Sequence, residues 1–441
     1  MNLSSLVGHV TELLLHTQGS AQPVDRLVSA FFHARTYLGS RDRRFISDAL
    51  YGIIRKRRYL EALLEQYLRE HPGSDDLDQP QKRFLPLYGI YALTVGRKEG
   101  DDPLPSSLWM AAFPSIKFDG FARWIEENAS LGFLSSSGEI SLAVRESFQD
   151  WMVERWRTQV GEELPALLAS LNLPAEVTLR VNALRTTRDE CAARLALEGI
   201  PVAPSRYSRE GLVAGKRFNA QISKAFAEGW FELQDEGSQF VSLLADPRPG
   251  EVVIDGCAGA GGKALHLAAM MENTGEIIAV DSEPKRLREL EKRARRAGVT
   301  IAKPLLKSEM VPETLASTAD LVLVDAPCSG SGTIRRNPSF KWTLTESLVS
   351  HYHAQQSEIL DFNARFVKPG GRLVYATCSL FREENEDVVE AFLGTHAGFR
   401  LSALREAAAR LGIAATEEML TLYPHRTRTD GFFIALLVRK S

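Results

Sequence analysis

The sequence predicts a multidomain chain: an α-helical N-terminal domain over residues 1–137, a small α+β domain over 141–232, and an α/β domain with a doubly wound parallel sheet over 233–441. Three observations support this prediction. The 441 residues exceed the size at which one hydrophobic core usually keeps growing. Apolar residues recur every three or four positions in the first part of the chain. In the last part, short apolar runs alternate with amphipathic helical patterns, which is typical of a parallel sheet covered by helices.

The first two domains are predicted from local patterns. Helical spacing in the first domain is clearest at Phe45, Ile46, Ala49, Leu50, Ile53 and Ile54. A serine-rich stretch over 134–138 is predicted to be a linker. In the second domain a helical pattern around Trp151 ends near Pro174. The alternation of apolar and polar residues over 177–181 then predicts a strand, and 189–197 predicts a short helix.

The third domain is predicted from five apolar runs with helical patterns between them. The predicted strands are 252–254, 277–280, 321–324, 373–375 and 432–438. The predicted helices are 263–272, 283–297, 344–367 and 384–394. We expect the first four strands to be parallel and the last to enter antiparallel at an edge of the sheet.

Composition narrows the class of protein. Lys plus Arg is 53 and Asp plus Glu is 56, so the formal net charge is −3, which excludes a uniformly basic protein but not a local nucleic-acid footprint. Four cysteines exclude a disulfide scaffold. The sequence has no run of about 18 uncharged apolar residues and no signal-peptide pattern at its start. We therefore expect a cytoplasmic enzyme with no membrane partner.

A glycine-rich loop follows the first predicted strand of the third domain. After Asp255 it comprises Cys257, Ala258, Gly259, Ala260, Gly261, Gly262 and Lys263. Glycines let the backbone approach a ligand, and Asp281 at the end of the next strand can bind both hydroxyls of a ribose. The spacing typical of dinucleotide and nucleoside triphosphate sites is absent, which favours S-adenosylmethionine as the cofactor. The alternative is a tight turn that binds nothing.

Two of the four cysteines are candidates for chemistry. Cys328 and Cys378 each follow a predicted strand, at the edge where open α/β sheets bind ligands. Neighbouring strands lie roughly 4.8 Å apart, so both thiols would face the cofactor crevice; a disulfide between them is the alternative. Cys191 is expected to be a small buried side chain and Cys257 to pack beside the cofactor. Because no C-x-x-C motif is present, we expect no metal site.

The residues around these cysteines resemble those of the RNA cytosine-5 methyltransferases. The matching stretches are Asp325–Gly330, Arg335–Pro338, Lys341–Trp342, Tyr375–Ser379, Arg180–Asn182, Gln234–Gln239, Glu383–Glu386 and Asp430–Phe433. Asp42–Phe45 and Tyr51–Gly52 resemble the NusB-like N-terminal domain of the bacterial branch that methylates 16S ribosomal RNA. The resemblance implies an RNA-binding helical domain and a Rossmann-like class I methyltransferase domain.

The resemblance also implies roles for individual residues. Cys378 matches the nucleophile, which would add to carbon 6 of cytosine and so activate carbon 5 toward methylation. Cys328 matches the thiol linked to product release. Asp325, three residues before it, is placed to steady ring nitrogen 3 and matches a residue near the cofactor. Residues 257–263 and Asp281 match the S-adenosylmethionine site. Spacing alone does not decide which cysteine attacks.

The sequence departs from the family pattern at two places. Gly259-Ala260 stands where the family usually has a small residue and a proline, so we expect a looser loop and weaker cofactor binding. The stretch over 305–309 lacks the aspartate that the family often places near the adenine. Glu309 is the only acidic residue in that stretch, and we assign no adenine contact to it.

Basic residues form three groups that are candidates for RNA contacts. Residues 41–58 carry seven basic and two acidic side chains, which could neutralise phosphates or form a solvated helix face. Residues 285–296 carry the same numbers, and we expect them to form a solvated face. Arg335, Arg336 and Lys341 follow the Cys328 loop and are expected to contact the RNA backbone, whereas Trp342 is expected to pack. The target base must be unpaired or flipped out of its stack.

Two other functions remain open at this point, and so does the oligomeric state. One is a non-catalytic RNA-binding factor for ribosome assembly that retains the fold, against which the pair of cysteines argues. The other is a methyltransferase that acts on amines or on protein. Such enzymes carry an Asn/Asp-Pro-Pro-aromatic turn where this chain has Asp325–Cys328, which disfavours this alternative.

Overall fold

The computed structural model describes residues 2–18, 22, 24–80, 82–96, 104–130, 141–413 and 418–441. By its packing the chain divides into two compact units, Met1–Asn172 with Arg336–Thr343, and Leu173–Arg335 with Leu344–Ser441. The predicted linker over 134–138, with the predicted domain end at 137, lies outside the described residues. The predicted middle domain is shared between the units, because its first helices belong to the first unit and its sheet belongs to the second.

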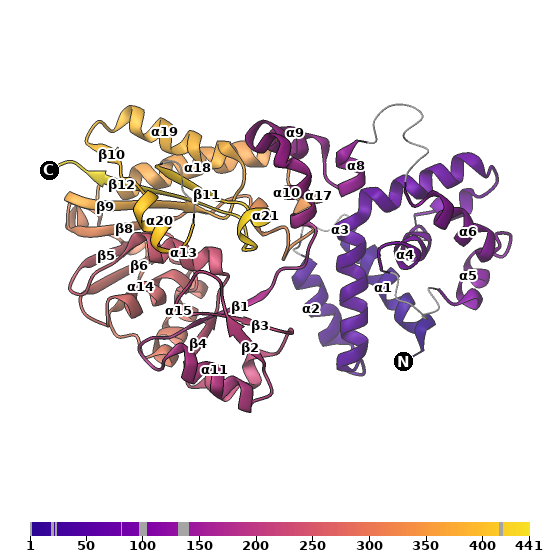
Figure 1. Cartoon of the computed structure of the whole chain (residues 1–441), viewed down its shortest axis with the longest axis horizontal. Coiled ribbons are helices and arrows are strands. Elements are labelled where there is room, and N and C mark those ends of the chain that lie inside the picture. The colour runs from indigo at the N-terminus through magenta and orange to yellow at the C-terminus, as the bar shows by residue number, and fades with distance from the viewer. Residues whose placement is uncertain are drawn as a thin grey trace. The chain divides into compact units, whose positions relative to one another are not determined.

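The first unit is helical in every element that the structure describes, as predicted (Figure 1). Its longer helices are α1 (Leu3–Thr17), α2 (Val24–Ala34), α3 (Ser40–Glu70), α4 (Phe84–Leu93), α5 (Ser106–Ala112), α6 (Phe118–Asn128), α9 (Asp150–Val160) and α10 (Leu164–Leu171), and its shorter ones are α8 (Leu142–Glu146) and α17 (Phe340–Thr343). The apolar positions predicted to lie on one helix face are buried along α3, among them Ile46, Leu50 and Ile53. The helix α17 comes from the segment that follows the Cys328 loop, far along the chain from the other helices.

The second unit begins with a small antiparallel sheet. Its strands are β1 (Val177–Val181), β2 (Val202–Pro204), β3 (Gly211–Ala214) and β4 (Phe231–Leu233), in the order β2-β3-β1-β4. The strand predicted over 177–181 is therefore confirmed, and the predicted short helix is α11 (Arg188–Leu197), which starts at a capping box between Thr187 and Glu190. The short helix α12 (Lys224–Ala227) precedes β4.

A larger sheet forms the rest of the second unit. Its strands are β5 (Val252–Asp255), β6 (Glu276–Asp281), β7 (Ala302–Leu306), β8 (Ala319–Asp325), β9 (Val367–Thr377), β10 (Phe399–Leu401), β11 (Met419–Leu422) and β12 (Phe432–Arg439). The order is β10-β12-β9-β8-β5-β6-β7, with β11 also paired to β12. The strands β5 to β9 pair with one another in parallel, as predicted for the first four apolar runs.

The last predicted strand is antiparallel but does not lie at an edge, so that part of the prediction is wrong. One side of β12 pairs with β9, and its other side pairs with β11 over 432–435 and with β10 over 437–439. These covering strands have three and four residues, too few to show an alternating pattern in the sequence. The strand β7 was missed for another reason, since none of its five residues is fully buried.

The sheet separates two hydrophobic clusters because successive strand residues point to opposite faces. On one face α13 (Glu236–Ala245), α14 (Gly262–Met270) and α15 (Pro284–Ala297) pack against strand residues that include Val253. On the other face α18 (Glu346–Ala364) and α19 (Glu386–Thr395) pack against strand residues that include Ile254 (Figure 1). Because β5, β6, β8 and β9 are parallel, their carboxyl ends meet at one edge of the sheet, where ligands bind in open α/β folds.

No helix in the described part of the chain is both long and apolar enough to cross a membrane.

Candidate active site

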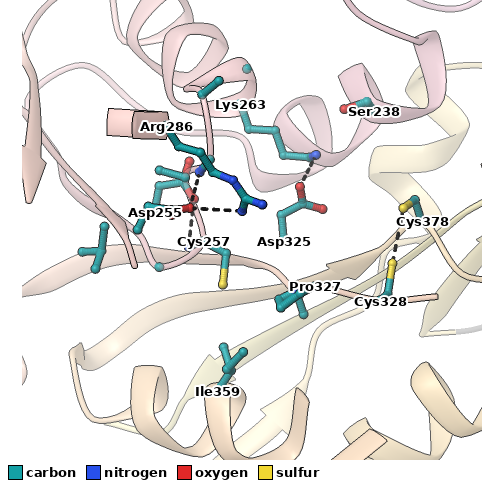
Figure 2. Close-up of a pocket in the computed structure, with 18 of the residues that line it drawn as sticks. Ser238, Asp255, Cys257, Lys263, Arg286, Asp325, Pro327, Cys328, Ile359 and Cys378 are labelled. Carbon is teal, nitrogen blue, oxygen red and sulfur yellow. Dashed lines mark hydrogen bonds and ion pairs between the residues drawn. The ribbon is translucent and has the colours of Figure 1, made fainter. Parts of the chain in front are cut away.

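A cavity of about 570 Å³ opens at this edge of the sheet. Most of the residues predicted to form a site line it, namely Cys257, Ala258, Gly259, Ala260, Gly262, Lys263, Asp281, Asp325, Cys328 and Cys378. Gly261 belongs to the loop but does not line the cavity. Figure 2 shows the acidic and basic side chains on one side of the cavity and the two sulfur atoms of Cys328 and Cys378 on the other.

The glycines of the loop serve two different purposes. A Cβ atom at Gly256 would lie 2.2 Å from Asn363, and one at Gly261 would lie 2.6 Å from Leu290, so these two glycines allow close packing. A Cβ atom at Gly259 or Gly262 would meet nothing within 4 Å. Both of the latter line the cavity, so their missing side chains leave open space at the start of α14, where a ligand can approach the backbone. The loop therefore fits an adenosine-type cofactor better than a tight turn without a ligand.

Two carboxylates stand at the ends of the strands beside this loop. Asp281 accepts hydrogen bonds from the backbone N–H groups of Gly259 (3.0 Å) and Glu283 (2.8 Å), which hold its side chain at the cavity wall. Asp255 is 1% exposed, and burial together with the charge of Asp325 raises its pKa to about 7. Sequence reasoning did not assign a role to Asp255, although its place as the last residue before the glycine loop was a usable signal.

Charged residues outside the loop restrain its backbone. Arg293 of α15 donates a hydrogen bond to the Ala260 carbonyl oxygen (2.9 Å), and Arg180 of β1 donates one to the Gly262 carbonyl oxygen (2.6 Å). Glu232 of β4, 5% exposed, pairs with Arg293 (3.0 Å) and also with Arg296. The loop is thus held in place although it lacks the family's proline.

The same contacts correct only part of the prediction for 285–296. Most of its basic side chains are exposed, as expected of a solvated face, namely those of Lys285, Arg286, Arg288, Lys292 and Arg295. Arg293 and Arg296 have side chains that are 18% and 20% exposed and are bound to Glu232, so this part of the helix is not a solvated face. The small sheet supplies Glu232 and Arg180, and the periodicity of α15 could not reveal partners from another sheet.

The two candidate thiols lie side by side. The strands β8 and β9 are parallel neighbours, and Asp325 is in register with Ala376. The loops after them bring the Sγ atoms of Cys328 and Cys378 to 3.3 Å (Figure 2). Both are free cysteines, so the structure does not contain the alternative disulfide. The hydrogen bond with Cys378, burial, and the charges of Cys378 and Glu384 raise the pKa of Cys328 well above that of an ordinary thiol.

The other two cysteines lie in different surroundings: Cys191 is buried as predicted, and packing of Cys257 beside a cofactor stays a prediction. Cys191 is fully buried in the core of the small sheet, and burial raises its pKa to about 12. Cys257 lines the cavity and packs against the cluster that contains Ile254, and burial raises its pKa. Among the residues that the structure describes, no group of three or more His, Cys, Asp or Glu side chains is arranged to hold a metal ion.

Asp325 is paired with a lysine of the glycine loop. The Nζ atom of Lys263 lies 2.5 Å from Oδ2 of Asp325, and the dashed line in Figure 2 marks this ion pair. The Asp325 side chain is 29% exposed toward the cavity, so it remains accessible to a ligand between the loop and the two thiols. Asp325 thus lines the cavity, and its contact with ring nitrogen 3 stays a prediction. Glu309, by contrast, is exposed and does not line the cavity.

A buried carboxylate that sequence reasoning missed joins the two cysteine loops. Glu384 is fully buried and accepts hydrogen bonds from residues that directly follow the two cysteines, Ser329 and Ser379. Its only signal in the sequence was its membership of the matching stretch Glu383–Glu386.

Two of the three residues predicted to contact RNA are structural instead. Arg335 is 6% exposed and donates hydrogen bonds to the carbonyl oxygens of Arg428, Thr429 and Pro174. Lys341 is fully buried in the first unit, where its Nζ atom contacts the carbonyl oxygens of Arg55, Glu146 and Ser147 and the side chain of Asn172.

Burial therefore overturns the RNA predictions for these two residues. A guanidinium or ammonium whose donors are used by buried carbonyl oxygens is not available to a phosphate, and burial lowers the pKa of Lys341 well below its usual value. Arg336 is partly exposed, and its contact with RNA stays a prediction. Trp342 packs as predicted, with its indole N–H donating to the Ile54 carbonyl oxygen (2.7 Å).

The basic cluster over 41–58 is also used in part by the fold. Arg58 forms a two-pronged ion pair with Asp150 (2.8 Å), Lys56 pairs with Glu146 (3.3 Å), and Arg57 pairs with Glu61 (2.9 Å). These pairs favour a structural role for the second half of the cluster. Arg41 and Arg44 lie on exposed surface at its other end.

Solved structures show which class of protein the fold and the site define. A methyltransferase homolog protein from Pyrococcus horikoshii is 29% identical, covers 68% of this chain and 97% of its own, and superposes with a TM-score of 0.58. The crystal structure of PH0851 is 29% identical, covers 99% of both chains, and has a TM-score of 0.75. The parallel sheet with its glycine loop and edge cavity is that of a Rossmann-like methyltransferase.

Sequence comparison identifies the family. Residues 242–438 match the 16S rRNA methyltransferase RsmB/F family, and residues 148–221 match a methyltransferase RsmF/B-like, ferredoxin-like domain. A probable ribosomal RNA small subunit methyltransferase B from Synechocystis sp. is 32% identical over 409 residues, which cover 90% of this chain and 91% of that protein. The chain belongs to the RsmB/F family of methyltransferases. The helical first unit is consistent with the predicted N-terminal domain, and its NusB-like identity stays a prediction.

The anchoring of the glycine loop leads to a first prediction. Glu232→Gln removes the charge that pairs with Arg293 and Arg296, so Arg293 should no longer hold the Ala260 carbonyl firmly, and the affinity for S-adenosylmethionine should fall about tenfold. Isothermal titration calorimetry measures the affinity, with Glu291→Gln on the exposed face of α15 as the matched control. An unchanged affinity in a folded Glu232→Gln protein would show that the loop keeps its shape alone.

The burial of Lys341 leads to a second prediction. Lys341→Ala leaves several buried oxygen atoms without a donor, so the free energy of unfolding of the first unit should fall by about 2–4 kcal/mol. Urea unfolding followed by circular dichroism measures the loss, and Arg41→Ala, at an exposed position of α3, is the control. A stable Lys341→Ala protein with reduced RNA affinity would restore the original interpretation of this residue.

Proposed function

We propose that this protein methylates carbon 5 of a cytosine in 16S ribosomal RNA, with S-adenosylmethionine as the methyl donor and a transient bond between Cys378 and the base. The observation that carries the proposal is the pair of free thiols, 3.3 Å apart, in the wall of the cavity that the glycine loop also lines. Membership of the RsmB/F family supports methyl transfer to ribosomal RNA.

The cofactor would be held at the glycine-loop side of the cavity. Asp281 would bind the ribose hydroxyls, and the open backbone at Gly259 and Gly262 would admit the rest of the adenosyl group. S-adenosylmethionine bound there supplies an electrophilic methyl carbon. The acidic side chain of Asp325 at the same wall would favour its positive charge.

Cys378 would activate the base. Carbon 5 of cytosine is a poor nucleophile, but addition of the Cys378 thiolate to carbon 6 breaks the C5=C6 double bond and pushes its electrons toward carbon 5 and ring nitrogen 3. Asp325 would hold a proton on nitrogen 3, drawn from the Lys263 ammonium beside it, and so neutralise the negative charge that develops there. This side of the cavity thus carries the groups that the adduct requires.

Cys328 would assist the release of the product. After methylation a base takes the proton from carbon 5, the electrons of that C–H bond restore the C5=C6 double bond, and the C–S bond breaks to give the Cys378 thiolate. The raised pKa of Cys328 favours its S–H form, which can donate a hydrogen bond to the departing sulfur 3.3 Å away. A leaving thiolate that is stabilised in this way leaves faster.

The nucleophile assignment is tested with Cys378→Ala. Methylation of 16S ribosomal RNA should fall by about a thousandfold or more, because the ring can no longer be activated, while affinity for S-adenosylmethionine stays within about twofold of the wild type. Bisulfite sequencing of the RNA and calorimetry with the cofactor measure the two effects, and Cys191→Ala in the helix α11 is the matched control. Full activity of Cys378→Ala would rule out this assignment.

The release assignment is tested with Cys328→Ala. This variant should form the bond to RNA but release it slowly, so a covalent protein–RNA complex should accumulate about tenfold over the wild type. The complex is measured as a band of reduced mobility on a denaturing gel after incubation with RNA and S-adenosylmethionine. Normal turnover without any trapped complex would contradict the role of Cys328. A complex that also forms with the double variant Cys328→Ala/Cys378→Ala would contradict it too, because that complex could not be the Cys378 adduct.

A further inference from the structure

Glu384 lies in the turn between β9 and α19 and is fully buried beneath the two cysteine loops. Its Oε1 atom accepts hydrogen bonds from the Ser329 N–H (2.8 Å) and the Gln356 side chain (3.1 Å). Its Oε2 atom accepts hydrogen bonds from the Ser329 and Ser379 hydroxyls, both at 2.5 Å. All four partners are donors, so the buried carboxylate is fully satisfied.

The two serines make this carboxylate a link between the thiols. Ser329 directly follows Cys328, and Ser379 directly follows Cys378. The two hydroxyls also contact each other at 3.2 Å, and the Gly332 N–H donates to the Cys378 carbonyl oxygen at 2.9 Å. Each cysteine is therefore one peptide bond away from a side chain that is bound to Glu384.

We propose that Glu384 is the positioning residue that holds the thiol of Cys328 against Cys378 and keeps it protonated for product release. The inference rests on the proposed function, and it adds a residue that touches neither the base nor the cofactor. A carboxylate that accepts charge-assisted hydrogen bonds from both loops fixes their spacing more firmly than the neutral contacts between them. Its negative charge also disfavours a second negative charge on the neighbouring sulfur.

Other titratable groups face Cys328 as well. They are Cys378 at the end of β9, Tyr352 of α18 and Tyr375 of β9. Burial is the main cause that raises the pKa of both tyrosines, which therefore remain neutral neighbours. Among these neighbours the charge of Glu384 contributes to the raised pKa of Cys328, and Glu384→Gln removes that charge with little change in shape.

The first experiment measures release. Glu384→Gln should lower kcat about tenfold, leave KM for RNA within about twofold, and raise the share of trapped protein–RNA complex as Cys328→Ala does. Glu390→Gln is the matched control, because Glu390 lies on exposed surface of the next helix and pairs with Arg382. A Glu384→Gln enzyme with wild-type turnover and no trapped complex, in an assay where Cys328→Ala traps RNA, would overturn the proposal and leave the proposed function intact.

The second experiment needs neither RNA nor methylation. The rate at which iodoacetamide alkylates Cys328 is followed against pH by peptide mass spectrometry in the full-length protein. Loss of the Glu384 charge should shift the alkylation profile of Cys328 to lower pH and raise its rate at pH 8 several-fold, whereas Glu390→Gln should leave it unchanged. A profile of Cys328 that does not move would overturn the proposal whatever the substrate of the enzyme is.

A second variant covers the case in which Glu384→Gln does not fold. Ser329→Ala keeps the charge and the backbone hydrogen bond but removes one hydroxyl that joins Glu384 to the Cys328 loop. It should trap RNA about threefold more than the wild type, and Ser329→Thr should restore normal release because it returns the hydroxyl. Equal trapping by both Ser329 variants would contradict a positioning role.

Discussion

The parallel pairing of β8 with β9 is the constraint on which the candidate active site depends. The register that places Asp325 opposite Ala376 ends both strands at the same level of the sheet. The two loops that follow are then close enough for their sulfur atoms to touch and for one buried carboxylate to reach both. If either strand slipped by one residue, its side chains would exchange faces of the sheet, and the cysteine loop after it would start from a different position.

The cofactor side of the cavity depends on a second contact, between the two sheets of the second unit. Both Glu232 and Arg180 belong to the small sheet. Glu232 acts on the glycine loop through Arg293, whereas Arg180 donates a hydrogen bond to the loop directly. The small sheet therefore supports the loop as well as preceding it in the chain. This explains how a loop with Gly259-Ala260 in place of the family's residues keeps a defined backbone.

The basic residues show that positive charge near a site is not sufficient to indicate RNA binding. Arg335 and Lys341 follow the Cys328 loop in the chain. The N–H groups of both side chains nevertheless donate hydrogen bonds to backbone carbonyl oxygens. Lys341 lies in the segment 336–343, which packs within the helical unit although it follows the Cys328 loop in the chain. The chain thus leaves the second unit after Arg335 and returns to it at Leu344.

Much of this protein could be predicted from the order of its residues. Apolar runs in the sequence predicted β5, β6, β8, β9 and β12, because such runs are local features. The glycine loop, Asp281 and the two cysteines were predicted to form one site because each stands at or after the end of a parallel strand, and these ends meet at one edge of the sheet. Only the tertiary structure decided which charged side chains are buried and what they bind. Glu232, Glu384, Arg335 and Lys341 find their partners in segments remote from their own, and a sequence read locally does not contain those distances. Burial of a charge depends on hydrogen-bond donors and acceptors that only the folded chain brings together.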